Sequence, residues 1–174
     1  MTPQQLFRQE CDLVERMLKR QGYVKTMFVI HCDAGIVPVL VQDGDHQQAY
    51  RLVGLLCTAY NATALVTMGE AWAAQGIGDG TRPALREDRR EVVAVTMMAR
   101  GPNGIERFQS IREMVRDRRG KAIGLRPDPA LPTKEFDGGV YDLLPMGDVS
   151  PEHRDEARAK LKAAGLELPT PTMH

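Results

Sequence analysis

TALVTMGEAW at residues 63–72 and EVVAVTMMA at residues 91–99 are the stretches that decide the fold. Both contain residues that favour strands, and the second is a nearly continuous apolar run, which is typical of a buried strand. We predict two strands, Thr63–Trp72 and Glu91–Ala99, joined by a long loop rich in Gly and Arg. Loops of this length without structure of their own are uncommon and usually functional. The rest of the chain can be arranged around this pair.

Three helices are predicted from apolar periodicity and capping signals. Residues 2–21 begin with a Thr2-x-x-Gln5 capping box, continue with an apolar stripe and stop at Gly22. Residues 46–61 are apolar around much of the circumference, which indicates a buried helix, and Gly54 within it suggests a close approach by another element. Residues 151–164 follow the cap Ser150 and carry a thin apolar stripe, as expected of a surface helix.

Further strands are predicted on both sides of the central pair. Residues 23–31 and 36–42 indicate a hairpin, and Pro38 places the second strand at a sheet edge, since proline cannot donate to a ladder. Residues 105–117 fit a helix or a strand. The turn at Pro102-Asn103-Gly104 favours a strand meander that continues to Lys121–Leu125.

Together these elements predict an α+β fold, with a mostly antiparallel sheet and two helices packed on one face. We assign residues 1–125 to this core domain. Residues 126–174 are assigned to an irregular, proline-rich arm, a polar terminal helix and a disordered tail.

Composition excludes some classes of function. The 174-residue chain has a formal net charge of zero and 5% aromatic residues, so we do not expect a dedicated nucleic-acid-binding protein. The three cysteines lack metal-binding spacing and indicate reduced thiols in a cytoplasmic protein. No apolar run is long enough to span a bilayer, and the N-terminus does not resemble a signal peptide. We expect no cofactor and no membrane partner.

One cluster contains residue types suited to metal binding or nucleophilic chemistry. Its members are His31, Cys32, Asp33, Asp43, Asp45 and His46. In a hairpin the two halves of this set lie about 20 Å apart at ~3.3 Å per residue, so they cannot share a metal. His31 and Cys32 are neighbours on a strand and point to opposite faces, which is unsuited to a catalytic pair. We interpret these residues as turn and cap residues.

The strongest candidate site is a group of acidic, aromatic and basic residues at one end of the central strand pair. An arginine cluster beside a carboxylate and a tryptophan could bind a small anion or an acidic surface. The candidate ligand-binding residues are Glu70, Trp72, Arg82, Arg86, Arg89 and Arg90.

Two other motifs are interpreted as solvated loops. Gly76–Gly80 is glycine-rich, but it lacks the Lys-Ser/Thr ending and the following helix of a phosphate-binding loop. A basic run could contact nucleic acid, but it is diluted by Glu113 and Asp117. Its members are Arg112, Arg116, Arg118, Arg119, Lys121 and Arg126.

The order ALVTMGEAW, a charged loop, DRREVVAV and then a hairpin resembles small bacterial or phage proteins of uncharacterised families, over residues 23–125. The resemblance implies a compact α/β domain and no particular activity. Two hypotheses follow from the sequence. The first is a non-catalytic binding or assembly module, a homo-oligomer that uses the 73–90 loop or the C-terminal arm. The second is a small-molecule or anion-binding protein, or an enzyme, with its site at Glu70 and the 73–90 loop.

Overall fold

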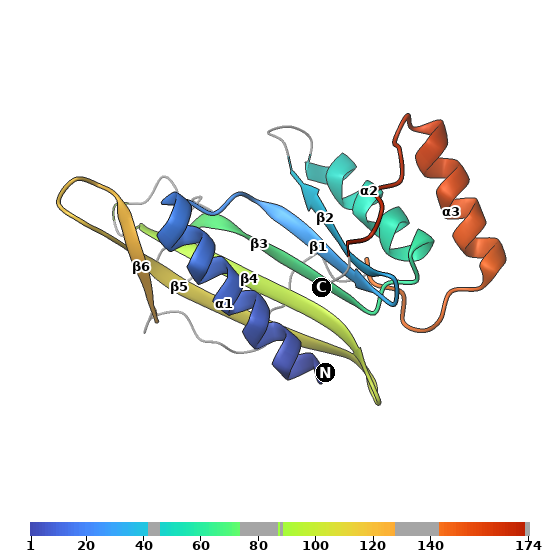
Figure 1. Cartoon of the computed structure of the whole chain (residues 1–174), viewed down its shortest axis with the longest axis horizontal. Coiled ribbons are helices and arrows are strands. Elements are labelled where there is room, and N and C mark those ends of the chain that lie inside the picture. The colour runs from blue at the N-terminus through green and yellow to red at the C-terminus, as the bar shows by residue number, and fades with distance from the viewer. Residues whose placement is uncertain (42–45, 74–86, 88, 128–142, 173–174) are drawn as a thin grey trace.

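A computed structural model describes residues 1–41, 46–73, 87, 89–127 and 143–172. Within them the chain forms a six-stranded antiparallel sheet and three helices (Figure 1), which confirms the predicted α+β class. The strands lie in the order β2-β1-β3-β4-β5-β6. In chain order the elements are α1 (Pro3–Gln21), β1 (Met27–Cys32), β2 (Gly35–Leu40), α2 (His46–Ala59), β3 (Ala64–Ala73), β4 (Arg90–Gly101), β5 (Gly104–Arg116), β6 (Ala122–Pro127) and α3 (Pro151–Ala163).

The predicted central strand pair forms the middle of the sheet. β3 and β4 align in ten consecutive pairs, from Ala64↔Ala99 to Ala73↔Arg90. A tight turn then brings β5 back along β4, starting with the pair Gly101↔Gly104, and Gly104 has a φ of 120° that suits glycine. The segment for which the sequence allowed helix or strand is therefore a strand, and the predicted meander through β6 is confirmed.

Helix α1 forms as its capping signals predict. The Thr2 hydroxyl accepts a hydrogen bond from the Gln5 backbone N–H at 3.2 Å, and the Gln5 side chain accepts one from the Thr2 N–H at 2.9 Å. At the other end Gly22 adopts a left-handed conformation with φ 82° and closes the helix on Leu18. Both ends of α1 therefore have capping hydrogen bonds within the chain, and these bonds define where the helix begins and ends.

The sheet has a separate apolar cluster on each face. Side chains alternate along the strands, so Val29, Val66 and Met97 contribute to one cluster, with α1. Ile30, Leu65 and Met98 contribute to the other, with α2 and α3. α1 and α2 therefore lie on opposite faces, and the two helices that share a face are α2 and α3 (Figure 1). Two helices thus share one face of the sheet, as predicted, while α1 covers the other face.

Helix α3 is more firmly attached than its polar sequence suggests. Ala157 and Leu161 are buried in the cluster of α2, and Leu144 from the preceding segment is buried with them. A Cβ on Gly54 would lie 3.3 Å from Leu143 Cδ2, so the predicted close approach to α2 is made by the C-terminal arm. The thin apolar stripe of α3 is thus sufficient to place the helix on α2.

Strand β2 is at the sheet edge, as Pro38 predicts. The Val41 N–H donates to the Thr26 carbonyl on the β1 side, whereas the backbone N–H of Ile36 donates to Thr172 on the outer side. Because backbone groups alternate in direction along a strand, the even-numbered residues of β2 point theirs away from the sheet. The missing N–H of Pro38 therefore costs no hydrogen bond to β1. Ile36 pairs outward with Thr172 through two backbone hydrogen bonds of 2.9 and 3.0 Å. The tail that the sequence suggested to be disordered thus includes one residue paired with the sheet.

Candidate functional sites

A cavity of about 480 Å³ opens at the end of the sheet nearest the start of α1. One wall comes from the first turn of α1 with Leu6, and another from His31 at the end of β1. The floor is the cross-strand pair Ala64↔Ala99, and His31 pairs with Ala64 in the same row. The complete lining is Met1, Thr2, Pro3, Leu6, His31, Cys32, Asp33, Gly35, Thr63, Ala64, Ala99 and Arg100. The small side chains of the alanines leave the space that larger core residues fill elsewhere.

His31 is held in this cavity wall by a buried carboxylate. Its Nε2 lies 3.1 Å from Glu10 Oε1, and the two side chains are only 9% and 5% exposed. The other oxygen, Glu10 Oε2, is buried without a hydrogen-bond partner among the described residues. Burying a carboxylate is costly unless it is paired, so this contact is the main compensation for placing Glu10 inside the protein.

Glu10 was not among the residues suggested by the sequence, although a signal was present. It lies four residues after Leu6 and four before Val14, on the apolar stripe of α1. A carboxylate on the apolar side of an amphipathic helix must find a buried partner, and buried acidic residues are rare without one. That position alone predicts a polar contact with the sheet.

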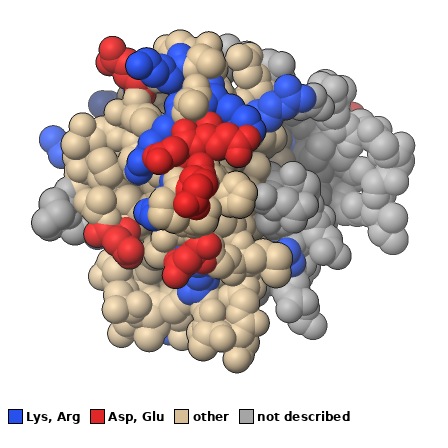
Figure 2. Space-filling model, turned by 90° about the vertical axis from the view of Figure 1, so that its right-hand side faces the viewer, with Lys and Arg blue, Asp and Glu red and all other residues tan. Residues whose placement is uncertain are grey.

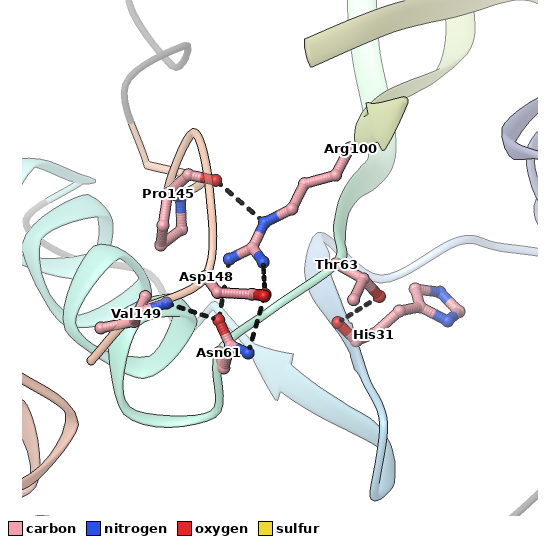
Figure 3. Close-up of polar contacts among 7 residues, drawn as sticks. All are labelled: His31, Asn61, Thr63, Arg100, Pro145, Asp148 and Val149. Carbon is pink, nitrogen blue, oxygen red and sulfur yellow. Dashed lines mark hydrogen bonds and ion pairs between the residues drawn. The ribbon is translucent and has the colours of Figure 1, made fainter. Parts of the chain in front are cut away.

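Arg100, which also lines the cavity, anchors the C-terminal arm (Figure 3). Its Nε donates to the Pro145 carbonyl, and its two Nη groups donate to Asp148 and to Asn61 Oδ1, each at 3.0 Å. Asn61 Oδ1 also accepts from the Val149 N–H at 2.9 Å. The Arg100 side chain is 14% exposed, so its bonds to Pro145 and Asn61 are partly shielded from water, whereas the Asp148 carboxylate is 91% exposed. The result is a link between the end of β4, the end of α2 and the segment leading to α3.

The Cys32 side chain lies on the opposite side of β1 from the His31 imidazole. Its thiol donates to the Gly35 carbonyl at 3.3 Å, whereas His31 meets Glu10 of α1. Asp43 and Asp45 lie outside the described residues, and no group of three or more metal-ligating side chains occurs among those described. Burial raises the pKa of the Cys57 thiol to about 12 and also raises that of Cys11, so both are poor nucleophiles.

The candidate group around Glu70 is only partly described. Glu70 Oε1 accepts a 2.7 Å hydrogen bond from the Val24 N–H, and Arg89 Cζ lies 5.0 Å from the centre of the Trp72 ring. Arg90 is opposite Ala73 in the ladder, whereas Arg82 and Arg86 lie outside the described residues. The structure therefore brings Trp72 and Arg89 together and gives Glu70 a backbone partner. Anion binding by the whole group stays a prediction.

Three arginines of the basic run, Arg112, Arg116 and Arg126, are paired with carboxylates. Arg116 makes two hydrogen bonds to Glu91, of 2.6 and 3.1 Å, which lower the pKa of the Glu91 carboxyl. Arg126 makes two to Glu113, and Arg112 reaches Glu15 on α1 at 3.0 Å. These contacts connect β5 to its neighbours and to α1. They offset the positive charge of these three members of the run.

A second hollow, here called the edge groove, lies between β2 and α2 and has a volume of about 340 Å³. Residues of the C-terminal tail form one of its margins, and the Tyr60 hydroxyl donates to the Pro169 carbonyl beside it. Leu40 is 56% exposed at the rim, and Leu166 and Leu168 are each 38% exposed. The edge groove is lined by Phe28, Pro38, Val39, Leu40, Val41, Ala49, Leu52, Val53, Leu56, Leu166, Glu167 and Pro169.

The outer side of α3 carries charges of both signs. Asp155 pairs with Arg158, and Glu156 with Lys160. Figure 2 faces this side of the molecule and shows acidic and basic side chains next to one another over its upper part. Such a mixed surface does not favour a partner of one charge.

No helix among the described residues is both long and apolar enough to cross a membrane. Comparison of the whole chain with protein-family models, with characterised proteins and with solved structures found no match.

Proposed function

We propose that this chain is a non-catalytic binding and assembly module, in which the β2 edge and the edge groove take up the C-terminal tail of a second copy. The observation that carries the proposal is the pairing of Thr172 with Ile36 beside an apolar groove. Addition of an extended segment to a sheet edge is a common mode of peptide recognition, in which backbone hydrogen bonds supply affinity and side-chain pockets supply selectivity. The tail shows which segment fits.

A second copy of the chain can supply the same segment. The tail begins directly after Gly165, which follows the end of α3 and has a φ of 77°. Only a short connection therefore joins α3 to the residues 166–172 that make these contacts. The same contacts can form between two copies by exchange of this element, a low-cost route to symmetric dimers. A cytoplasmic location fits this proposal, because Cys11, Cys32 and Cys57 are all free thiols.

The edge groove is favoured over the Glu70 group as the binding surface. One Glu70 carboxylate oxygen is already hydrogen-bonded to the Val24 N–H, and it would have to exchange that partner for a ligand. The edge groove instead offers exposed leucines beside outward-pointing backbone groups of β2.

A chain that ends at Gly165 should bind a synthetic peptide of residues 166–174, whereas the full chain, whose own Thr172 already pairs with Ile36 at the β2 edge, should bind it much more weakly. Fluorescence anisotropy of a labelled peptide gives the affinity, and circular dichroism checks that the shortened chain is folded. A peptide with Thr172→Pro is the matched control, because it lacks the N–H that bonds to the Ile36 carbonyl.

Light scattering separates the two parts of the proposal. A full chain with the mass of a dimer and a shortened chain with that of a monomer support exchange between copies. A monomeric full chain would reject assembly while leaving peptide recognition intact, and a folded shortened chain that ignores the peptide would reject recognition itself.

Replacing Pro38 with valine should increase self-association of the full chain. The backbone N–H of residue 38 points outward, so valine adds a donor to an edge that now supports a single bridge at Ile36. Size-exclusion chromatography with light scattering should show a larger apparent mass that rises with concentration. Val39→Ile is the control, since residue 39 faces β1 with its backbone and adds no outward donor. Identical behaviour of the two variants would mean that Pro38 does not protect the edge.

A further inference from the structure

The C-terminal tail is held beside the edge groove at two separate points, and their spacing indicates what kind of segment fits. Thr172 pairs with Ile36 at the β2 edge, and the Tyr60 hydroxyl donates to the Pro169 carbonyl three residues earlier. We propose that Tyr60 determines the specificity of this site, which selects extended segments of the form Pro-x-x-Thr over regular β-strands. This inference rests on the function proposed above, because it names the ligand class of the same groove.

Strand β2 can form only one complete pair with an added segment. Its backbone groups point outward at even-numbered positions, so the next outward position after Ile36 is Pro38. Proline has no N–H to donate, so a second pair, between Pro38 and Thr170, would lack one of its two hydrogen bonds. Among the described residues, the pairing of Ile36 with Thr172 is the one bridge on the outer side of β2. A peptide that relies on a long ladder for affinity therefore gains little at this edge.

Tyr60 supplies a second contact away from the ladder. It directly follows α2, and its partly buried ring packs against the apolar cluster that α2 and α3 share, which holds the hydroxyl in place. Burial raises the pKa of this hydroxyl, so it stays protonated and able to donate. The ligand needs only a carbonyl at this point, and a residue without an N–H meets that need.

The sequence of the tail agrees with these requirements. Positions 169 and 171 are both prolines, and the first of them contributes its carbonyl alone. Thr172 both donates and accepts, through backbone hydrogen bonds of 2.9 and 3.0 Å, and its hydroxyl reaches the Ile36 carbonyl at 3.3 Å. Prolines favour an extended backbone before binding, so less conformational entropy is lost when the segment is ordered.

The test measures amide exchange in the full chain, where the tail itself is the ligand. Replacing Tyr60 with phenylalanine removes only the hydroxyl, so the protection of the Thr172 and Ile36 N–H groups should fall about fivefold, the usual contribution of one neutral hydrogen bond. Amides of β3 report on unfolding of the whole sheet and should keep their protection. Hydrogen exchange followed by NMR gives both values.

Tyr50→Phe is the matched control. Tyr50 also lies on α2, its ring packs edge-on against Phe28, and no described hydrogen bond joins its hydroxyl to the tail. Unchanged protection in Tyr60→Phe, or an equal loss in the control, would overturn the role of Tyr60. Peptide binding by the chain that ends at Gly165 would survive that result, so the two proposals fail separately.

Two tail variants test the ligand class. Replacing both Pro169 and Pro171 with valine gives a segment that favours a strand, and it should lower the protection of the Thr172 N–H, because the ladder still stops at Pro38. Higher protection would show that the site prefers β-strands. Thr172→Val keeps the branched shape and the N–H but removes the hydroxyl, and it should lower the protection of the Ile36 N–H about twofold. No change would reject the requirement for threonine.

Discussion

Replacing His31 with leucine should lower the free energy of unfolding by about 3–5 kcal/mol, the usual cost of removing one partner of a buried ionic pair. The reason is the position of Glu10, whose carboxylate is 5% exposed and has one oxygen without a partner even when His31 is present. Without the imidazole, the whole carboxylate would be buried against apolar neighbours. Urea denaturation followed by circular dichroism measures the change.

The double variant His31→Leu with Glu10→Leu should recover most of that loss. Two apolar side chains need no partner, and replacing a buried ion pair by hydrophobic residues is often neutral or stabilising. Lys160→Ala, which breaks an exposed pair with Glu156 on α3, is the control and should leave the urea midpoint unchanged. A double variant as unstable as His31→Leu would show that the loss comes from packing around residue 31 and not from the unpaired carboxylate.

Replacing Arg100 with methionine should release the C-terminal arm and α3, with a loss of about 2–3 kcal/mol, comparable to one strong hydrogen bond to a charged group. Methionine keeps an apolar stem and removes all three donors to Pro145, Asp148 and Asn61. The bond to Asp148 should contribute least, because that carboxylate is 91% exposed. Native-state hydrogen exchange should show faster exchange in α3 than in β3.

Arg158→Met is the matched control for this experiment. Arg158 pairs with Asp155 on the exposed side of α3, and it supports no contact with the sheet among its described bonds. Equal acceleration of exchange in both variants would mean that α3 is held by Ala157 and Leu161 alone, and that Arg100 adds nothing to its attachment.

Much of the fold could be predicted because local signals agreed with the final structure. The capping box at Thr2 and Gln5, the turn before Gly104 and the edge proline at position 38 each act within a few residues, so each is visible in sequence. Such local signals did not predict which face of the sheet each helix covers. Which face of the sheet a helix covers depends on how residues 22–26 and the β1–β2 hairpin turn, and periodicity says nothing about that direction.

The sites were harder to predict, because they depend on pairs of residues far apart in sequence. Glu10 and His31 lie 21 positions apart and meet only when α1 packs on the sheet. Ala64 and Ala99 resemble ordinary strand residues until their pairing places two small side chains together. The sequence emphasised exposed arginines and a tryptophan instead, and of these the structure shows the contact between Arg89 and Trp72.

The two ends of the described chain meet at the same hairpin, and this affects how the protein can be re-engineered. Met1 and Gly35 line one cavity, while Thr172 pairs with Ile36, the next residue along β2. A short linker could therefore join the ends, and new termini could be opened in the turn between β5 and β6, at the exposed residues Arg118 and Arg119. Such a circular permutant would keep every strand pairing in the sheet. It would also keep any affinity tag on the new termini away from the β2 edge.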